Sequence, residues 1–386
     1  FIREHSSDDV RSLALKGGKY PNVDMPTAIT QIAGRQIAAE KIPSWRALDA
    51  ILYPKHLSME QCSSEVTARY KTTLAQGKSL ADLTGGFGVD CSFLASGFDE
   101  AAYVERQSEL CDIAAHNFQI LDLNHIQVHN EDGVTYLLNM APVDCIFLDP
   151  ARRNEHGGKM VAISDCEPNV AELEDLLLSK AQRIMVKLSP MLDLSLAIKE
   201  LRHVEEAYIL SVNNDCKELL LLLGHQPKTD APIHCINIQT KGNEHIQTFN
   251  FTREEEQKSN CNYADTLGDY LYEPNASLLK AGAFRSIAAA FHISKLHPNS
   301  HLYTSDQLIE NFPGRVFRVT DVCSFNKKEI KEKLAGLTKA NLTVRNFPAS
   351  VAELRKRLKI TEGGDAYLFA TTLNNDQKVL MKCEKI

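Results

Sequence analysis

Two carboxylates and three glycines lie close together in the stretch ADLTGGFGVDCSF, residues 81–93. Asp82 ends a short apolar run, glycines follow at positions 85, 86 and 88, and Asp90 comes where the pattern becomes helical. A glycine-rich turn between a strand and a helix exposes backbone N–H groups to a ligand. This spacing therefore predicts a site for a nucleotide-like molecule.

The residues after the glycines distinguish between three such ligands. A P-loop needs Lys followed by Ser or Thr, whereas this chain has Val89 and Asp90, and an aspartate at a helix N-terminus repels phosphate. A dinucleotide-binding turn needs a third glycine at position 91, which is Cys91. S-adenosylmethionine carries an amine and a sulfonium, so its pocket tolerates acids. The residues favour this third ligand.

Three further acids follow expected strands. Glu105 lies in YVERQ, Asp132 in NED and Asp149 in FLDPARR. In open α/β sheets, ligands bind at the carboxyl ends of the strands. We therefore expect these acids to share one edge with the glycine turn, although Asp132 equally suits the N-cap of the helix that follows it.

The stretch from Asp82 to Gly88 resembles the first motif of the class I S-adenosylmethionine-dependent methyltransferases, with Thr84 in place of the usual first glycine. The form D-x-T-x-G-x-G-x-D is similar to that of bacterial ribosomal RNA methyltransferases that modify the guanine exocyclic amine. The resemblance implies that Glu105 meets the cofactor ribose and Asp132 the adenine amino group. The cofactor-binding residues that it implies are Asp82, Thr84, Gly85, Gly86, Gly88, Asp90, Glu105, Arg106 and Asp132.

The segment DPARR is similar to the Asp-Pro-Pro-aromatic motif of amine-methylating family members. Asp149 and Pro150 match that motif, and the next two positions do not. A carboxylate and the following carbonyl can orient a planar amine toward a methyl group, and proline fixes the turn. We expect Asp149 and Pro150 to be catalytic. Arg152 and Arg153 are candidate substrate-binding residues that stack on a base or bind a phosphate, or they pair with nearby acids.

DPARR also resembles the Asp-Pro-Pro-Arg motif of uracil carbon-5 methyltransferases. Those enzymes need a cysteine nucleophile after the fifth strand, where this chain has Lys187-Leu188-Ser189-Pro190. Cys216 is the nearest substitute, and its position in a hairpin favours a structural role. This second resemblance is therefore the weaker one.

The order of the elements predicts the fold that positions these residues. Residues 1–75 have helical spacing, with one helix stopped by Pro43 and a second in SMEQCSSEVTARYKTTLAQ. Within it, Gln61, Ser63 and Ser64 either close over the cofactor or form a capped helix start. Apolar strands then alternate with helices and end in an antiparallel hairpin, which predicts an α/β, Rossmann-like core with a seven-stranded sheet.

The C-terminal part predicts a small α+β domain of order βαβαββ. Over its whole length the chain resembles class I methyltransferases with a C-terminal THUMP-like domain, and true THUMP domains present RNA to modifying enzymes. Residues 315–386 contain 15 Lys or Arg against 8 Asp or Glu, although the whole chain has a net charge of −7. We expect four segments: a helical one (1–76), the core (77–226), a hairpin and connector region (227–313) and a THUMP-like domain (314–386).

Composition indicates the cellular compartment of the protein and whether it binds metal. No apolar run is long enough to span a membrane, and the ten cysteines form no C-x-x-C pair. They are expected to be free thiols in a reducing cytoplasm, and unclustered Cys and His predict no metal site.

Together the residues and the resemblance predict a cytoplasmic S-adenosyl-L-methionine-dependent methyltransferase that modifies a base amine in rRNA or tRNA. Two alternatives stay open. One is methylation of a protein or small molecule, and the other is a non-catalytic RNA-binding protein with a relic cofactor pocket.

Overall fold

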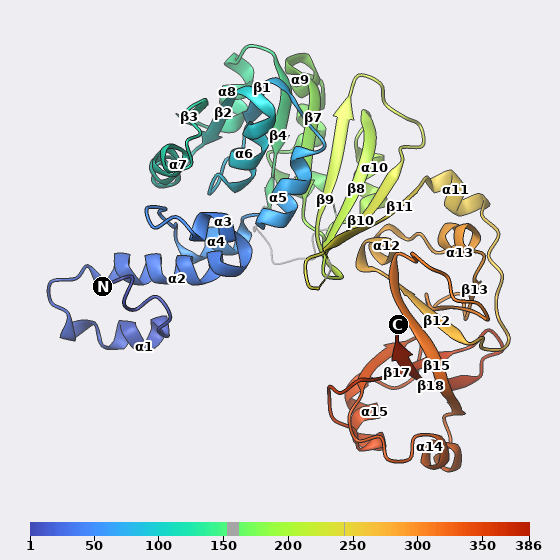
Figure 1. Ribbon diagram of the computed structural model, residues 1–386. Coiled ribbons are helices and arrows are strands. Elements are labelled where there is room, and N and C mark those ends of the chain that lie inside the picture. Colours follow the sequence, from blue (N-terminus) through green and yellow to red (C-terminus); the bar gives the residue numbers. More distant parts are fainter. Residues whose placement is uncertain (153–161, 243) are drawn as a thin grey trace. The chain divides into compact units, whose positions relative to one another are not determined.

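The computed structural model describes residues 1–152, 162–242 and 244–386 (Figure 1). The chain divides into two compact units, which are described separately. Unit 1 consists of residues 1–207 and 217–229, and unit 2 of residues 208–216 and 230–386.

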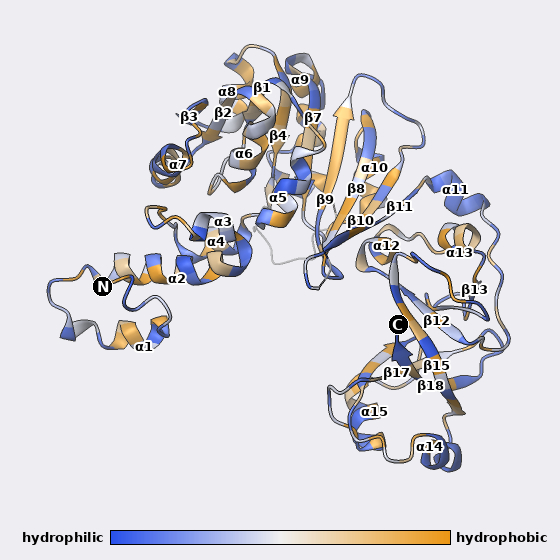
Figure 2. Ribbon diagram, viewed as in Figure 1, coloured by the Kyte–Doolittle hydropathy of each residue, from blue (hydrophilic) through white to orange (hydrophobic). Residues whose placement is uncertain are grey.

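The sheet that contains the core strands has the order β11-β10-β8-β9-β7-β4-β1-β2-β3. The predicted number of seven strands is therefore wrong, because the hairpin strands β10 (Ile233–Gln239) and β11 (His245–Phe251) continue the sheet beside β8. The pairs β1–β2, β2–β3, β1–β4 and β4–β7 are parallel, and β7 pairs with β9 in the antiparallel direction. This arrangement confirms the predicted Rossmann-like α/β class. Figure 2 shows β8 and β9 as largely hydrophobic, as expected for strands covered on both faces. The strands are β1 (Gly77–Asp82), β2 (Phe98–Glu105), β3 (Ile126–Asn130), β4 (Val143–Leu148), β7 (Ala181–Leu188), β8 (Val204–Val212) and β9 (Asp215–Gly224).

Helices follow these strands as the sequence predicts. Several begin at a side-chain cap, because a carboxylate or amide oxygen accepts from the first free N–H groups. Two short strands, β5 (Ala151–Arg152) and β6 (Cys166–Glu167), pair antiparallel beside the core. The helices are α6 (Val89–Leu94), α7 (Ser108–Ile120), α8 (Gly133–Asn139), α9 (Val170–Lys180) and α10 (Leu194–Glu200).

The N-terminal part is helical, and Pro43 separates two helices as predicted. The prediction of a single second helix is wrong, because the structure has two helices there, α4 and α5, with a break at residues 62–64. The break forms because Ser64 accepts a hydrogen bond from the backbone N–H of Thr67 at 3.3 Å and so caps a new helix. The helices are α1 (Val10–Leu15), α2 (Met25–Lys41), α3 (Pro43–Arg46), α4 (His56–Gln61) and α5 (Glu65–Thr72).

Aromatic packing joins these helices to the glycine turn. The ring of Phe87, inside the turn, lies 5.1 Å from that of Trp45 and 6.3 Å from that of Tyr53, centre to centre. All three side chains are buried in one hydrophobic cluster. Burying such rings contributes about 2–3 kcal/mol each. The N-terminal helices thus hold the turn in place.

Unit 2 contains a seven-stranded sheet of order β13-β14-β12-β15-β18-β17-β16. Strand β12 lies in the region expected to be a connector, yet it pairs with β15 and so belongs to the same sheet as the C-terminal strands. The predicted βαβαββ order after residue 314 is observed. The strands are β12 (Tyr270–Pro274), β13 (Ser294–Lys295), β14 (Tyr303–Ser305), β15 (Gly314–Ser324), β16 (Asn341–Arg345), β17 (Ala366–Thr372) and β18 (Lys378–Lys385), with helices α12 (Ala276–Ala281), α13 (Ser286–Phe291), α14 (Lys327–Lys333) and α15 (Val351–Leu358).

A β-hairpin precedes that sheet in the chain. Strands β10 (Ile233–Gln239) and β11 (His245–Phe251) pair antiparallel, and α11 (Arg253–Lys258) follows them. Gly242 in the hairpin turn has φ +80°, a conformation that favours glycine. The hairpin was expected from the sequence.

The ten cysteines all lie in the described residues, and none of them is assigned to a disulfide. Within the described part of the chain, none of the helices combines the length and the apolar composition that a membrane span requires.

Candidate active site

The glycine turn after β1 is shaped by close packing on one side and open space on the other. A β-carbon at Gly85 would lie 2.3 Å from Cε2 of Tyr103, so a larger residue does not fit there. Gly86 and Gly88 have φ values of +54° and +85°. A β-carbon at Gly86 would meet only the carbonyl oxygen of Thr84, at 3.8 Å. The turn therefore presents bare backbone to open space.

Asp82 lies at the base of this turn and is 1% exposed. Its Oδ1 accepts the backbone N–H of Thr84 at 3.0 Å, and its buried Oδ2 has no hydrogen-bond partner among the described residues. Burial raises the pKa of this carboxyl to about 8, and the nearby carboxylates Asp90 and Asp149 act in the same direction. A buried, unpartnered oxygen beside bare backbone suits a ligand with a cationic amine.

The acids after β2 and β3 occupy different environments. Glu105 bridges two turns, because its Oε2 accepts from Gly86 N at 3.0 Å and its Oε1 from Gln107 N at 2.9 Å. Asp132 is the N-cap of α8, which its alternative interpretation predicted. Arg106 is exposed and lies 3.4 Å from Glu167. Of these three residues, only Glu105 contacts the glycine turn in a hydrogen bond described by the structure.

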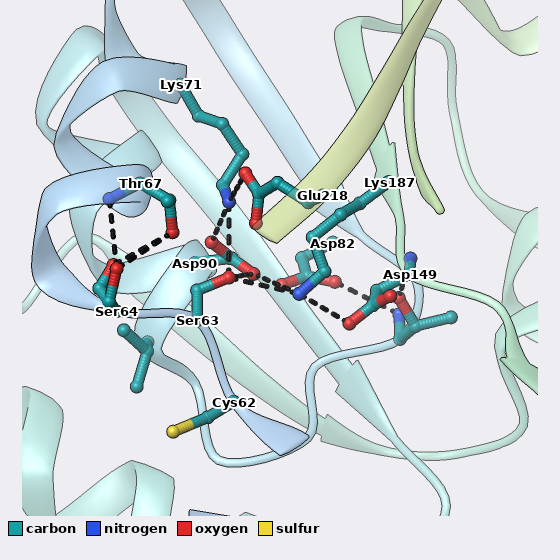
Figure 3. Close-up of polar contacts among 12 residues, drawn as sticks. Cys62, Ser63, Ser64, Thr67, Lys71, Asp82, Asp90, Asp149, Lys187 and Glu218 are labelled. Carbon is teal, nitrogen blue, oxygen red and sulfur yellow. Dashed lines mark hydrogen bonds and ion pairs between the residues drawn. The ribbon is translucent and has the colours of Figure 1, made fainter. Parts of the chain in front are cut away.

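Asp90 lies in the first turn of α6, and its buried carboxylate faces Ser63, Lys71 and Lys187 (Figure 3). Its Oδ2 accepts from Ser63 Oγ at 2.7 Å and lies 2.9 Å from Lys187 Nζ, and its Oδ1 lies 3.0 Å from Lys71 Nζ. Burial alone would raise the pKa of Asp90, but the two ammonium groups outweigh it and hold that pKa below its usual range. Lys71 also pairs with Glu218 at 2.6 Å.

Asp149 lies just beyond β4 and is fixed at two points. Its backbone N–H donates to Thr84 Oγ1 at 2.6 Å, and its Oδ2 lies 2.6 Å from Lys187 Nζ. The side chain is 36% exposed, whereas Lys187 is 9% exposed. Desolvation raises the pKa of Asp149 against the lowering effect of Lys187. Pro150, the next residue, is buried.

The structure thus brings Asp149 together with Asp82, Thr84 and Asp90, which come from a separate segment of the sequence. The structure does not place the two arginines after Pro150 in this group. The backbone of Arg152 pairs with Cys166 across β5 and β6, and Arg153 lies outside the described residues.

Sequence reasoning missed the lysines that connect these acids. Lys187 is the next-to-last residue of the apolar strand β7, at the same sheet edge as Asp149, and Lys71 is buried on α5. Each is a charged residue at a position where the surrounding pattern predicts burial, and such a residue requires a partner. That signal was available for Lys187 in RIMVKLSP.

Comparison with known proteins places this chain in a family. Residues 314–385 match the family described as THUMP domain-like, residues 270–313 a ferredoxin-like domain, and residues 49–155 protein-L-isoaspartate(D-aspartate) O-methyltransferase. A proposed methyltransferase from Porphyromonas gingivalis W83, known from its crystal structure, is 35% identical to this chain, with a TM-score of 0.88, over 100% of this chain and 96% of that one. The chain belongs to the methyltransferase family with a C-terminal THUMP-like domain.

Other solved structures match this THUMP-like methyltransferase over part of its length. An rRNA methylase from Streptococcus thermophilus is 13% identical over 42% of this chain and 96% of that one, with a TM-score of 0.32. TrmN from Thermus thermophilus is 13% identical over 44% of this chain and 51% of that one, with a TM-score of 0.35. A search of curated proteins found no match. The family assignment rests on the full-length relative.

Proposed function

We propose that this THUMP-like methyltransferase transfers a methyl group from S-adenosyl-L-methionine to an exocyclic amine of a base in rRNA or tRNA. The observation that carries the proposal is the position of Asp149. Its partly exposed carboxylate lies at the sheet edge that also carries the glycine turn, to which it is tied through Thr84. We further expect the protein to act in the cytoplasm.

The residues of the glycine turn fit the cofactor. Gly86, where a β-carbon would face open space, would allow close approach of its methionine part, and the unpartnered Oδ2 of Asp82 would accept its cationic amine. Glu105 would receive the ribose by exchanging its hydrogen bond with Gly86. When bound, the sulfonium supplies an already activated methyl group.

Asp149 would orient the acceptor. A carboxylate that accepts a hydrogen bond from a planar amine fixes the direction of the nitrogen lone pair, and the backbone carbonyl beside Pro150 would accept the second N–H. Such positioning can supply a large part of the rate, since well-aligned intramolecular reactions gain about 7–11 kcal/mol over unaligned ones. The proton of the methylated amine would then leave to solvent at the exposed edge of Asp149.

RNA is the proposed acceptor because of the C-terminal part of the chain. It matches the THUMP domain-like family, and residues 315–386 carry a local charge of +7. Helix α15 ends in the basic residues Arg355, Lys356 and Arg357. Basic side chains attract phosphates without regard to sequence. Arg152 and Arg153 are proposed to bind the nucleotide near Asp149.

A protein acceptor is the second candidate. It is favoured by the match of residues 49–155 to protein-L-isoaspartate(D-aspartate) O-methyltransferase, and by the absence of the aromatic residue that would stack on a base after Pro150. This candidate uses the same cofactor and differs only in the molecule that reaches Asp149.

The two candidates separate in one experiment. The purified protein is incubated with methyl-labelled S-adenosylmethionine and either RNA or protein extracted from a strain that lacks the gene. We expect label in RNA, and nucleoside mass spectrometry should find the same methylated base in wild-type RNA and not in the deletion strain. Label only in protein would support the second candidate, and label in neither fraction would contradict both.

A further inference from the structure

Lys187 connects three parts of the first unit through one buried ammonium group (Figure 3). Its Nζ lies 2.6 Å from Asp149 Oδ2, 2.9 Å from Asp90 Oδ2 and 3.0 Å from Ser63 Oγ. An ammonium has three N–H donors, so these three contacts use all of them. The direction of the lysine head group is therefore fixed from three sides.

The strand pairing explains why these groups meet. Strands β4 and β7 run parallel and adjacent, with Leu148 opposite Val186. Asp149 and Lys187 each follow directly, so their side chains emerge at the same carboxyl edge. Asp90 reaches this edge from the first turn of α6, and Ser63 from the break between α4 and α5.

We propose that Lys187 is a positioning residue for methyl transfer, which holds Oδ2 of Asp149 so that Oδ1 faces the acceptor amine. This inference rests on the proposed function. The main chain of Asp149 is already tied to Thr84, and Lys187 ties its side chain to the helix that follows the glycine turn. The acceptor carboxylate is thus held in a constant position relative to the cofactor site, as in-line transfer requires.

Lys71 provides an internal comparison for Lys187. Both lysines are buried, at 0% and 9% side-chain exposure, and both contact Ser63 and Asp90. They differ in the third partner, which is Glu218 for Lys71 and Asp149 for Lys187. A purely structural role predicts similar consequences for both lysines, whereas a positioning role predicts a loss of turnover specific to Lys187.

The protonation of Asp149 gives a second distinction. Lys187 lowers the pKa of Asp149, so removing its charge should raise that pKa and move the acidic limb of the turnover profile to higher pH. Replacing Glu218 leaves Lys187 and Asp149 in contact and should not move that limb. The titratable or charged groups around Lys187 from the neighbouring elements are Lys41, Cys62, Lys71, Asp82, Asp90, Asp149 and Glu218.

The test measures cofactor binding by calorimetry and single-turnover methyl transfer to RNA from the deletion strain, over a range of pH. We expect Lys187→Met to bind S-adenosylmethionine within about threefold of the wild type and to lose about 100-fold in turnover, with the acidic limb moved to higher pH. Lys187→Arg, which keeps the charge, should recover part of the turnover. The matched control is the double variant Lys71→Met with Glu218→Gln, which removes the equivalent pair and should retain turnover.

The double variant Lys187→Met with Asp149→Asn adds a coupling measurement. If Lys187 acts through Asp149, the two losses will be strongly non-additive. If Lys187→Met does not fold, Lys187→Gln has the same predicted loss and the same pH shift. Wild-type turnover in Lys187→Met, an equal loss in the control pair, or additive losses would overturn the inference alone. A wild-type protein that binds no cofactor, or labels no RNA, would overturn the proposed function and the inference with it.

Discussion

Each unit of the molecule contains a buried carboxylate held by two cations, and the two clusters differ in what lies next to them. In unit 1, Asp90 is held by Lys71 and Lys187. In unit 2, Glu273 is 2% exposed. Its carboxylate accepts hydrogen bonds from Arg315 Nε at 2.8 Å and from the Arg345 guanidinium at 3.2 Å. By burial and charge alone the two clusters look alike.

The two clusters differ in the groups that their cations contact next. Lys187 also contacts the partly exposed Asp149, and the unpartnered Oδ2 of Asp82 lies nearby at the end of β1. Arg315 and Arg345 instead tie β12 to β15 and β16, and Arg315 also packs over the ring of Phe317. The cluster of unit 1 thus extends to a partly exposed carboxylate, as the proposed function requires, whereas the cluster of unit 2 joins strands of its sheet.

The largest effect expected from this contrast is on turnover. Asp149→Asn should reduce methyl transfer by about 100-fold or more while cofactor binding persists, because the amide presents the acceptor amine with an altered hydrogen-bonding partner. Glu273→Gln should leave single-turnover transfer at saturating RNA unchanged. Rapid-quench transfer of labelled methyl measures both. Equal losses in the two variants would remove the functional distinction between the clusters.

The next effect concerns stability, where the clusters should behave alike. Asp90→Asn leaves two buried ammonium groups with one carboxylate fewer, and Glu273→Gln leaves two guanidinium groups without their acid. Each should lower the free energy of unfolding by about 3–5 kcal/mol, as measured by urea denaturation of the relevant transition. If either variant lowers the free energy of unfolding by well under about 1 kcal/mol, water must solvate its cations in place of the lost carboxylate.

Asp82 should make stability depend on pH. Its pKa is about 8 in the folded protein and near 3.8 in the unfolded chain, so the folded state keeps a proton that the unfolded state releases. Stability without cofactor should therefore fall as pH rises from about 5 to about 8. Asp82→Asn should flatten this decline, and cofactor binding near neutral pH should release protons. Parallel stability profiles of variant and wild type would contradict this account of Asp82.

The smallest expected effect is a difference in cofactor binding between variants of two glycines that have similar backbone conformations. Gly86 and Gly242 both have positive φ, and a β-carbon would meet only distant atoms or none at either position. Alanine at each should cost about 1–2 kcal/mol of stability through backbone strain. Only Gly86→Ala should also weaken cofactor binding in a calorimetric titration. A similar loss of cofactor binding in Gly242→Ala would indicate a general effect on folding.

Much of the fold could be predicted because local pattern and global structure agree. Apolar strands alternating with helices indicate a parallel sheet, and the glycine turn indicates where it opens. Helical spacing alone predicts one continuous helix across Cys62. The cap at Ser64 that divides it was one of two interpretations that the sequence allowed for residues 61–64. The sheet pairing of β12 depends on distant partners, which a local pattern does not reveal.

The acids of the candidate site were predicted, but their environments were not. Sequence spacing brought Asp82, Asp90 and Asp149 to one edge of the sheet. It did not indicate that Asp90 faces two lysines, because Lys71 and Lys187 are 116 positions apart in the chain and meet only through tertiary packing. The role of Asp132 as a helix cap was one of two interpretations that its sequence allowed.

The central claim is that the turn around Gly86, with Asp82 beneath it, binds S-adenosylmethionine. Calorimetric titration of the purified full chain tests it most directly. The account predicts saturable one-site binding that is weakened in Gly86→Ala and is accompanied by proton release near neutral pH. No binding of S-adenosylmethionine or S-adenosylhomocysteine at millimolar ligand would contradict it.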